Sequence, residues 1–139
     1  MVIPDVNVLV YAFREDTPYH DQALSWLVSR LGDPMEEIII PDLVLVGFLR
    51  ICTNPRIFHE PSTTEEATEF TRSVISQSTY KTAPALGAEP LLDLLVESQS
   101  RADLVTDAYI AFVALQLGAT VATYDRDFRR FDNLRLVTP

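Results

Sequence analysis

The stretch LVTDAYIAFVALQLGATVATYDRDFRRFDNLRLV, residues 104–137, predicts a helix and two strands in close succession. Residues 106–118 form an apolar run that ends at a glycine, a common C-terminal signal of a helix. The apolar runs at residues 119–125 and 134–137 predict strands. A helix that leads directly into a strand is typical of parallel sheets, so this stretch favours an α/β fold.

The rest of the chain continues this alternation of strands and helices. Apolar runs predict strands at residues 2–5, 37–41 and 80–83. We assign no element to the apolar run at residues 8–13. The predicted helices carry these end signals: Thr17 as N-cap with Pro18 after it and a stop at Gly32, Asp42 as N-cap of the helix before Asn54, a capping box of Thr63 and Glu66, and a start near Glu89 and Pro90.

We therefore expect a parallel central sheet flanked by helices on both faces, with residues 1–139 as a single domain. Crossover connections in such sheets are right-handed, which places the loops that follow the strands along one edge. Ligands of such sheets usually bind at this edge, outside the carboxyl ends of the strands.

Composition narrows the class of protein. Of the 139 residues, 47% are hydrophobic and 22% charged, as expected for a soluble folded chain. No apolar run approaches the ~20 residues that cross a bilayer, so we expect no membrane segment, and nothing resembles a signal peptide. Cys52 is the only cysteine, which favours the reducing cytoplasm. The net charge of −9 argues against coating of nucleic acid, but not against carboxylates that hold divalent cations.

Three aspartates lie where such a sheet binds ligands. Asp5 follows the first strand, Asp125 ends another strand, and Asp107 begins the helix between. Three carboxylates brought together would repel one another unless a cation such as Mg²⁺ or Mn²⁺ lay among them. Each also has a simpler explanation: Asp5 as a turn or cap residue, Asp107 as a favourable charge at a helix start, and Asp125 with Asp127 as an Asx-turn.

Three blocks of the sequence carry a family resemblance. PDVNVLVYAF (4–13), FLRICTNPRIF (48–58) and the stretch 104–137 resemble, in this order, the blocks of PIN-domain ribonucleases, and in particular the VapC toxins of VapBC toxin–antitoxin systems. The resemblance covers nearly the whole chain. It implies a PIN-like three-layer fold and a metal-dependent endoribonuclease that hydrolyses RNA phosphodiester bonds.

The resemblance also implies which residues form the active site. Asp5, Asp107 and Asp125 match the family's metal-binding and catalytic acids, with Mg²⁺ or Mn²⁺ as the cofactor. Asp127 matches a nearby acid whose role varies and would be auxiliary. The partners implied are an RNA substrate, a VapB-like antitoxin that blocks the acidic groove, and a second copy of the chain in a homodimer.

Further polar residues near these acids are candidates for supporting roles. Asn7 and Thr123 match small polar positions that would hydrogen-bond a ligand carboxylate, although Thr123 as an ordinary strand residue is an equal alternative. Arg50 and Arg126 are candidates for contacts with RNA or with the antitoxin. The arginines at 129–130 could bind phosphates as well, or form a solvated basic turn.

One position departs from the family pattern. PIN-domain ribonucleases usually carry a glutamate in the helix of the second block, where this chain has Gly47. Asp42 is better explained as a helix cap, whereas Asp103 would share a face with Asp107 if that segment is helical. The missing side chain could also leave space for a water. An alternative function follows from this departure: a catalytically weakened PIN-like module that binds RNA or a protein partner.

Overall fold

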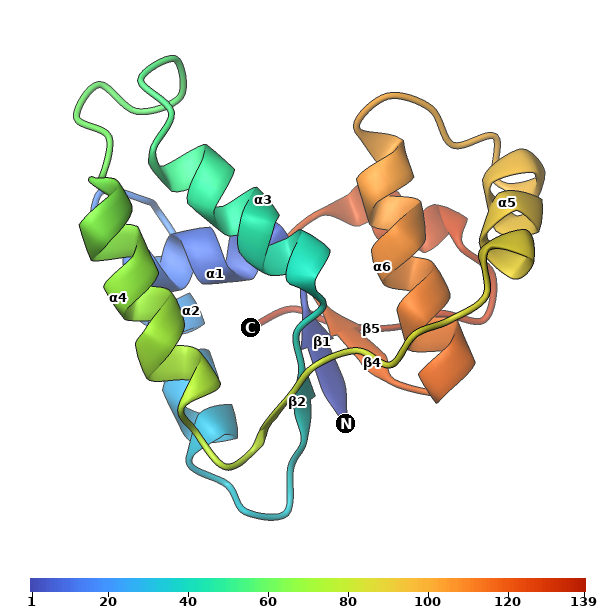
Figure 1. Ribbon diagram of the computed structural model, residues 1–139, viewed down its shortest axis with the longest axis horizontal. Coiled ribbons are helices and arrows are strands. Elements are labelled where there is room, and N and C mark those ends of the chain that lie inside the picture. Colours follow the sequence, from blue (N-terminus) through green and yellow to red (C-terminus); the bar gives the residue numbers. More distant parts are fainter.

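A five-stranded parallel sheet forms the centre of the protein (Figure 1), in a computed structural model that describes all residues 1–139. The strands lie in the order β3-β2-β1-β4-β5, and every neighbouring pair is parallel. The predicted parallel sheet is confirmed. Its strands are β1 (Val2–Pro4), β2 (Ile38–Ile39), β3 (Tyr80–Lys81), β4 (Thr120–Ala122) and β5 (Arg135–Val137).

Helices cover both faces of this sheet, which confirms the predicted three-layer α/β architecture. Figure 1 shows α1 to α4 grouped on one side of the sheet and α5 with α6 on the other. Their bounds are α1 (Val6–Phe13), α2 (His20–Leu31), α3 (Asp42–Cys52), α4 (Thr64–Ile75), α5 (Ala88–Glu97) and α6 (Leu104–Leu117), and a short 3-10 helix, η1 (Arg126–Arg130), connects β4 to β5.

The central strand β1 and its neighbour β4 are almost completely buried. They pair in the register Ile3 with Val121 and Pro4 with Ala122, and Ile3, Val121 and Ala122 are fully buried. The backbone N–H of Asp5 extends this pairing by donating to the carbonyl of Ala122 at 2.9 Å. The polar residues that follow β1 and β4 are therefore held side by side on a rigid base. No helix is both long and apolar enough to span a membrane.

Helix α1 is the element that sequence reasoning did not assign. Its sequence, VNVLVYAF, is rich in valine, which has a low helix propensity, and five of its eight residues are buried. Asp5 starts the helix as its N-cap, and its side chain accepts a hydrogen bond from the N–H of Val6. Tertiary burial and this cap together outweigh the weak helix propensity. Asp5 therefore lies at the junction where β1 ends and α1 begins.

Two predicted helix starts are wrong. Thr17 does not cap α2; its hydroxyl donates to the carbonyl of Arg14 in a preceding turn, and the helix begins only at His20. Asp42 is the first residue of α3, because Pro41 takes the extended cap position before it. The capping box of Thr63 and Glu66 at α4 is confirmed. The stop of α6 is also confirmed: Gly118 adopts φ +60°, a left-handed conformation that glycine accepts without strain.

Candidate active site

The sequence-predicted acids lie around one cavity at the carboxyl edge of the sheet. The strand order reverses between β1 and β4, which is where open parallel sheets bind their ligands. Asp5 follows β1, Asp125 follows β4 by three residues, and Asp107 lies in the first turn of α6. All three line a cavity of about 690 Å³, whose walls also include residues of α1 and α3.

Asp5 is the most completely held of these acids. It is only 5% exposed, and its carboxylate accepts three hydrogen bonds. The donors are the N–H of Val6 at 2.6 Å, the amide of Asn7 at 2.6 Å and the hydroxyl of Thr123 at 2.8 Å. Burial nevertheless raises the pKa of Asp5 to about 6, against the lowering effect of the bonds from Thr123 and Val6. The carboxylate of Asp5 is thus well hydrogen-bonded, but no cation of the chain neutralises its charge.

Asn7 and Thr123 join Asp5 to the loop after β4. The hydroxyl of Thr123 donates to Asp5 and accepts from the backbone N–H of Asp125 at 2.9 Å. The side-chain oxygen of Asn7 accepts from the N–H of Tyr124 at 3.4 Å. Of the two alternatives for Thr123, the structure favours the polar contact over an ordinary strand position. These bonds fix the spacing between the loops that carry Asp5 and Asp125.

Asp107 contrasts with Asp5 because no cation of the chain is paired with it and no hydrogen bond lowers its pKa. It is half-buried, and every cause that acts on its pKa raises it, to about 7. Burial is the largest of these causes, followed by the negative charges of Asp5, Asp125, Asp127 and Asp103. A carboxylate in this environment needs a cation, or it keeps its proton at higher pH than usual.

Asp125 combines the two roles that the sequence left open. Its carboxylate accepts from the N–H of Asp127 at 2.8 Å, which is an Asx-turn that caps η1, and it also lines the acidic cavity. The side chain of Asp127 is exposed and lies outside this cavity. Asp127 therefore acts on the site through its backbone N–H and through its charge near Asp107.

The position of the missing glutamate lies against Val6. Gly47 is buried on α3 and faces Val6, so that a Cβ at position 47 would lie 2.9 Å from Cγ2 of Val6. A Cβ at this position would therefore have no free space, although Gly47 itself lines the acidic cavity. Asp42 is exposed and does not line the cavity, whereas Asp103, at the start of α6, does. Sequence spacing indicated Asp103, but nothing in it indicated the contact between Val6 and Gly47.

The chemistry of these donors fits a hard divalent cation. The carboxylates of Asp5, Asp107 and Asp125 surround the cavity without a lysine or arginine bonded to any of them. As the side chains stand, no three acidic, histidine or cysteine residues lie close enough together to hold a metal ion by themselves. Mg²⁺ is usually held by one or two carboxylates together with waters and substrate phosphates, so an open acidic cavity suits it.

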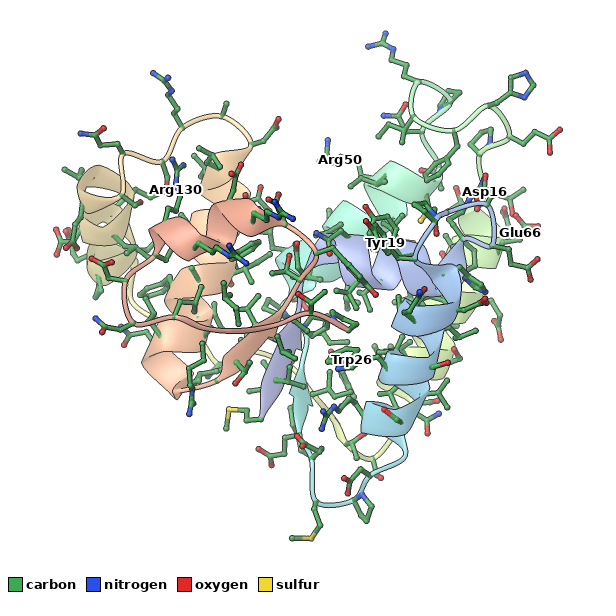
Figure 2. All side chains as sticks on the ribbon, turned by 180° about the vertical axis from the view of Figure 1, so that it is seen from behind. Asp16, Tyr19, Trp26, Arg50, Glu66 and Arg130 are labelled. Carbon is green, nitrogen blue, oxygen red and sulfur yellow. The ribbon has the colours of Figure 1, made fainter.

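The two arginines predicted as contact residues lie in different places. Arg50 is exposed on α3, one turn after Gly47, and lines the acidic cavity; Figure 2 shows it at the edge of the molecule. Arg126 lines a neighbouring cavity, which shares Asp125 with the first. Tyr11 is a lining residue that sequence reasoning missed, because it lies one helical turn after Asn7 on the unassigned helix α1.

These features define a parallel α/β protein with an acidic, cation-accepting cavity at the switch point of its sheet. A family model described as the PIN domain matches residues 2–134, so the chain belongs to the PIN-domain family. Ribonuclease VapC25 of Mycobacterium tuberculosis is 36% identical, with the alignment covering all of this chain and 99% of that protein. Ribonuclease VapC43 of the same species is 34% identical, over 97% and 92% of the two chains.

Solved structures share this fold. VapC20 of Mycobacterium tuberculosis, described as a sarcin-ricin loop cleaving toxin, matches with a TM-score of 0.74 at 16% identity over the full length of both chains. VapBC2 from Rickettsia felis, bound to a DNA fragment from its promoter, matches with a TM-score of 0.69 at 20% identity, over 99% of this chain and 98% of that one. The PIN-like fold predicted from the resemblance is confirmed.

Proposed function

We propose that this protein is a metal-dependent endoribonuclease and the toxin of a type II toxin–antitoxin system. The observation that carries the proposal is the single cavity, in a chain of the PIN-domain family, that Asp5, Asp107 and Asp125 line together. Full-length relatives named VapC ribonucleases support the same activity. RNA is the substrate, and hydrolysis of a phosphodiester bond is the reaction.

Asp5, Asp107 and Asp125 would hold Mg²⁺ or Mn²⁺, and a bound ion of this kind stabilises negative charge on a phosphoryl group and lowers the pKa of a water. The chain's own groups orient the acids. Asn7 and Thr123 fix the carboxylate of Asp5, and the N–H of Asp127 fixes that of Asp125. The guanidinium of Arg50, on the wall of the same cavity, is placed to bind a substrate phosphate.

The proposed partners follow from the same cavity. A VapB-like antitoxin would cover the acidic cavity with a basic side chain and so block both metal and RNA. The Rickettsia felis structure, in which a similar fold is part of a VapBC assembly, supports such a partner. We further propose that residues 1–139 act as a single domain, as a homodimer, in the cytoplasm.

Cleavage of total RNA in the presence of Mn²⁺ tests the activity. The wild-type protein is expected to cut RNA and Asp5→Ala to lose cutting, because it removes a proposed metal ligand. Glu69→Ala is the matched control, since Glu69 is an exposed acid on α4, away from the cavity. Equal cutting by the wild-type protein and Asp5→Ala would contradict the proposal.

The alternative, a weakened module that binds without cutting, is favoured by the missing glutamate at Gly47, where a Cβ would lie 2.9 Å from Cγ2 of Val6. Calorimetric titration with Mn²⁺ separates the two functions. A nuclease binds the ion in a manner that depends on Asp107, whereas a binding module shows no such heat but still retains RNA.

A further inference from the structure

A second cavity adjoins the acidic one and differs from it in charge. It measures about 560 Å³ and opens on the other side of Asp125, which lines both cavities. Asp125 is the one acidic side chain in its lining, and its cationic side chains are Arg126 and Arg129, both exposed on η1. Neither arginine forms a salt bridge, whereas Arg14 and Arg30 are each paired with an acid. Two free guanidinium groups thus stand beside the proposed site of cleavage.

Three tyrosines form the wall between the two cavities. Tyr19 stacks on Tyr124 with ring centroids 4.6 Å apart and an interplanar angle of 21°, and both rings also contact Tyr11. Tyr11 lines the acidic cavity, and Tyr19 and Tyr124 line the second one. Tyr19 is 43% exposed, so part of its ring is free although the stack holds it in place. Figure 2 shows Tyr19 near the middle of the molecule, with Arg130 on η1 to one side.

The remaining lining adds hydrogen-bonding groups to this aromatic surface. Gln22 lies one turn after Tyr19 on α2 and offers both a donor and an acceptor, and Thr138 offers a hydroxyl. Neither Tyr19 nor Gln22 was singled out from the sequence as a binding residue, because the cavity joins elements that are far apart along the chain.

We propose that this second cavity binds the nucleotide next to the scissile phosphate of a single-stranded RNA segment, an inference that rests on the function proposed above. Arg126 and Arg129 bind the phosphate of that nucleotide, and its base lies against the ring of Tyr19 within reach of Gln22. Unpaired RNA bases are commonly stacked on aromatic side chains and recognised along their edges, while arginines bind the backbone. Because Asp125 belongs to both cavities, a nucleotide held here places the adjoining phosphate at the acidic cavity.

The charge distribution explains why a protein of net charge −9 could bind RNA at all. RNA approaching the acidic cavity alone meets carboxylates, and only Arg50 on that wall carries a positive charge. The guanidinium groups of the second cavity supply a local attraction immediately beside it. The cavity is polar and its cations face solvent, which suits a phosphodiester better than an apolar peptide.

Binding of fluorescein-labelled single-stranded RNA dodecamers, of oligo(U), oligo(A) and mixed sequence, tests the inference. The binding measurements use Asp107→Asn as the parent, so that RNA is not consumed, and anisotropy is recorded over a range of salt concentrations with Mg²⁺ present. Adding Arg126→Ala and Arg129→Ala is expected to reduce the slope of log Kobs against log[salt] by about 0.7 for each lost phosphate contact. Arg72→Ala, an exposed arginine on α4, removes one positive charge away from both cavities and is the control for each of the two arginine changes.

The aromatic contact is tested separately. Tyr19→Ala is expected to weaken binding about ten-fold, within the usual range for loss of one base stack, and Tyr19→Phe to keep it. In the cleaving wild-type background Tyr19→Ala should raise KM and leave kcat nearly unchanged, with thermal unfolding measured to show that the variant is folded.

The inference is overturned if the double arginine variant binds like Arg72→Ala while the wild-type protein still cuts RNA; the cavity would then belong to a protein partner. If the wild-type protein neither binds nor cuts any RNA, the proposed function itself fails. The two failures are therefore distinguishable.

Discussion

The two sides of the acidic cavity are built differently, although each contributes an aspartate. On the side of β1 and β4, Asp5 accepts hydrogen bonds from Val6, Asn7 and Thr123 and is almost completely buried. On the side of α6, Asp107 is half-buried and has only negative charges acting on it. The carboxylate of Asp5 therefore stabilises the fold, whereas the ionised carboxylate of Asp107 destabilises it in the absence of a cation.

This difference shows how the protein divides structure from chemistry. Asp5 ends β1, caps α1 and meets Thr123 after β4, so removing it affects three elements. Asp107 lies in the first turn of α6, where the helix dipole favours a negative charge, but it makes no bond that the fold requires. The residues on the α6 side can therefore serve a ligand, because the hydrogen bonds on the β1 side already stabilise the fold around the cavity.

The largest expected effect is a difference in stability between two alanine variants that both abolish cleavage. Asp5→Ala removes the cap of α1 and leaves the donors of Val6, Asn7 and Thr123 without their acceptor. Caps and buried unpaired donors each cost about 1–2 kcal/mol, and both variants relieve charge repulsion. We therefore expect Asp5→Ala to unfold with a free energy about 2 kcal/mol lower than that of Asp107→Ala.

Urea denaturation of the two variants without metal measures this difference directly. Loss of RNA cleavage in both confirms that each reaches the site. Equal free energies of unfolding would mean that Asp5 is no more a part of the fold than Asp107, and the contrast between the two sides would disappear.

A second prediction concerns the third wall of the cavity, on α3. Gly47→Glu restores the family's acid, but its Cβ would lie 2.9 Å from Cγ2 of Val6. Overpacking of this kind typically costs 1–3 kcal/mol, so the variant should be destabilised by about 2 kcal/mol. Val6→Ala removes the clash, and the double variant should recover about 1 kcal/mol relative to the sum of the two single changes.

A double-mutant cycle from thermal or urea unfolding gives this coupling energy. Gly47→Ala separates the effect of the Cβ from that of the carboxylate, because it brings only the clash. If the single changes are additive, Val6 does not occupy the place of the missing glutamate. In that case a side chain at position 47 has room on the α3 side of the cavity.

The sequence predicted the sheet and the gathering of the acids better than it predicted the reasons for their behaviour. The strands, the capping box of α4 and the glycine stop of α6 rest on local signals, and these were confirmed. Helix α1 was missed because its valine-rich run has no helical periodicity of its own. Its stability comes from burial, which only the tertiary structure shows, and from the cap at Asp5, which the sequence offered only as one of several explanations of that residue.

For the site, residue types and spacing were enough to place Asp5, Asp107 and Asp125 at one edge of the sheet. They were not enough to show that Asp5 is fully hydrogen-bonded and Asp107 is not, because that depends on which side chains the packed loops bring near. Nor could they show the contact between Val6 and Gly47, which joins positions 41 residues apart. The cavity lined by Tyr19 and Arg126 combines α2 with η1 and likewise required the fold.

The smallest expected effect is a pH dependence of stability that separates the two acids. Their pKa values are raised in the folded protein, to about 6 for Asp5 and about 7 for Asp107. Between pH 4 and these values the folded state binds more protons than the unfolded state, so the free energy of unfolding falls as pH rises. Metal-free protein in EDTA should therefore be more stable at pH 5.5 than at pH 7.5, by an amount on the order of 1 kcal/mol after allowance for solvent screening.

Between pH 6 and pH 7 the carboxyl of Asp107 releases more of its proton than that of Asp5, because its pKa is the higher of the two. Asp107→Asn should therefore lose more of the fall in stability above pH 6 than of the fall below it, as measured by thermal unfolding at half-unit steps. Comparison with the wild-type protein cancels the contributions of all other titrating groups. Added Mg²⁺ should flatten the wild-type curve at neutral pH, because an ion that binds the ionised carboxylates stabilises only the folded state. If Mg²⁺ flattens the curve of Asp107→Asn equally, the cation is bound on the Asp5 side of the cavity. The unpaired carboxylate of Asp107 would then serve some other ligand.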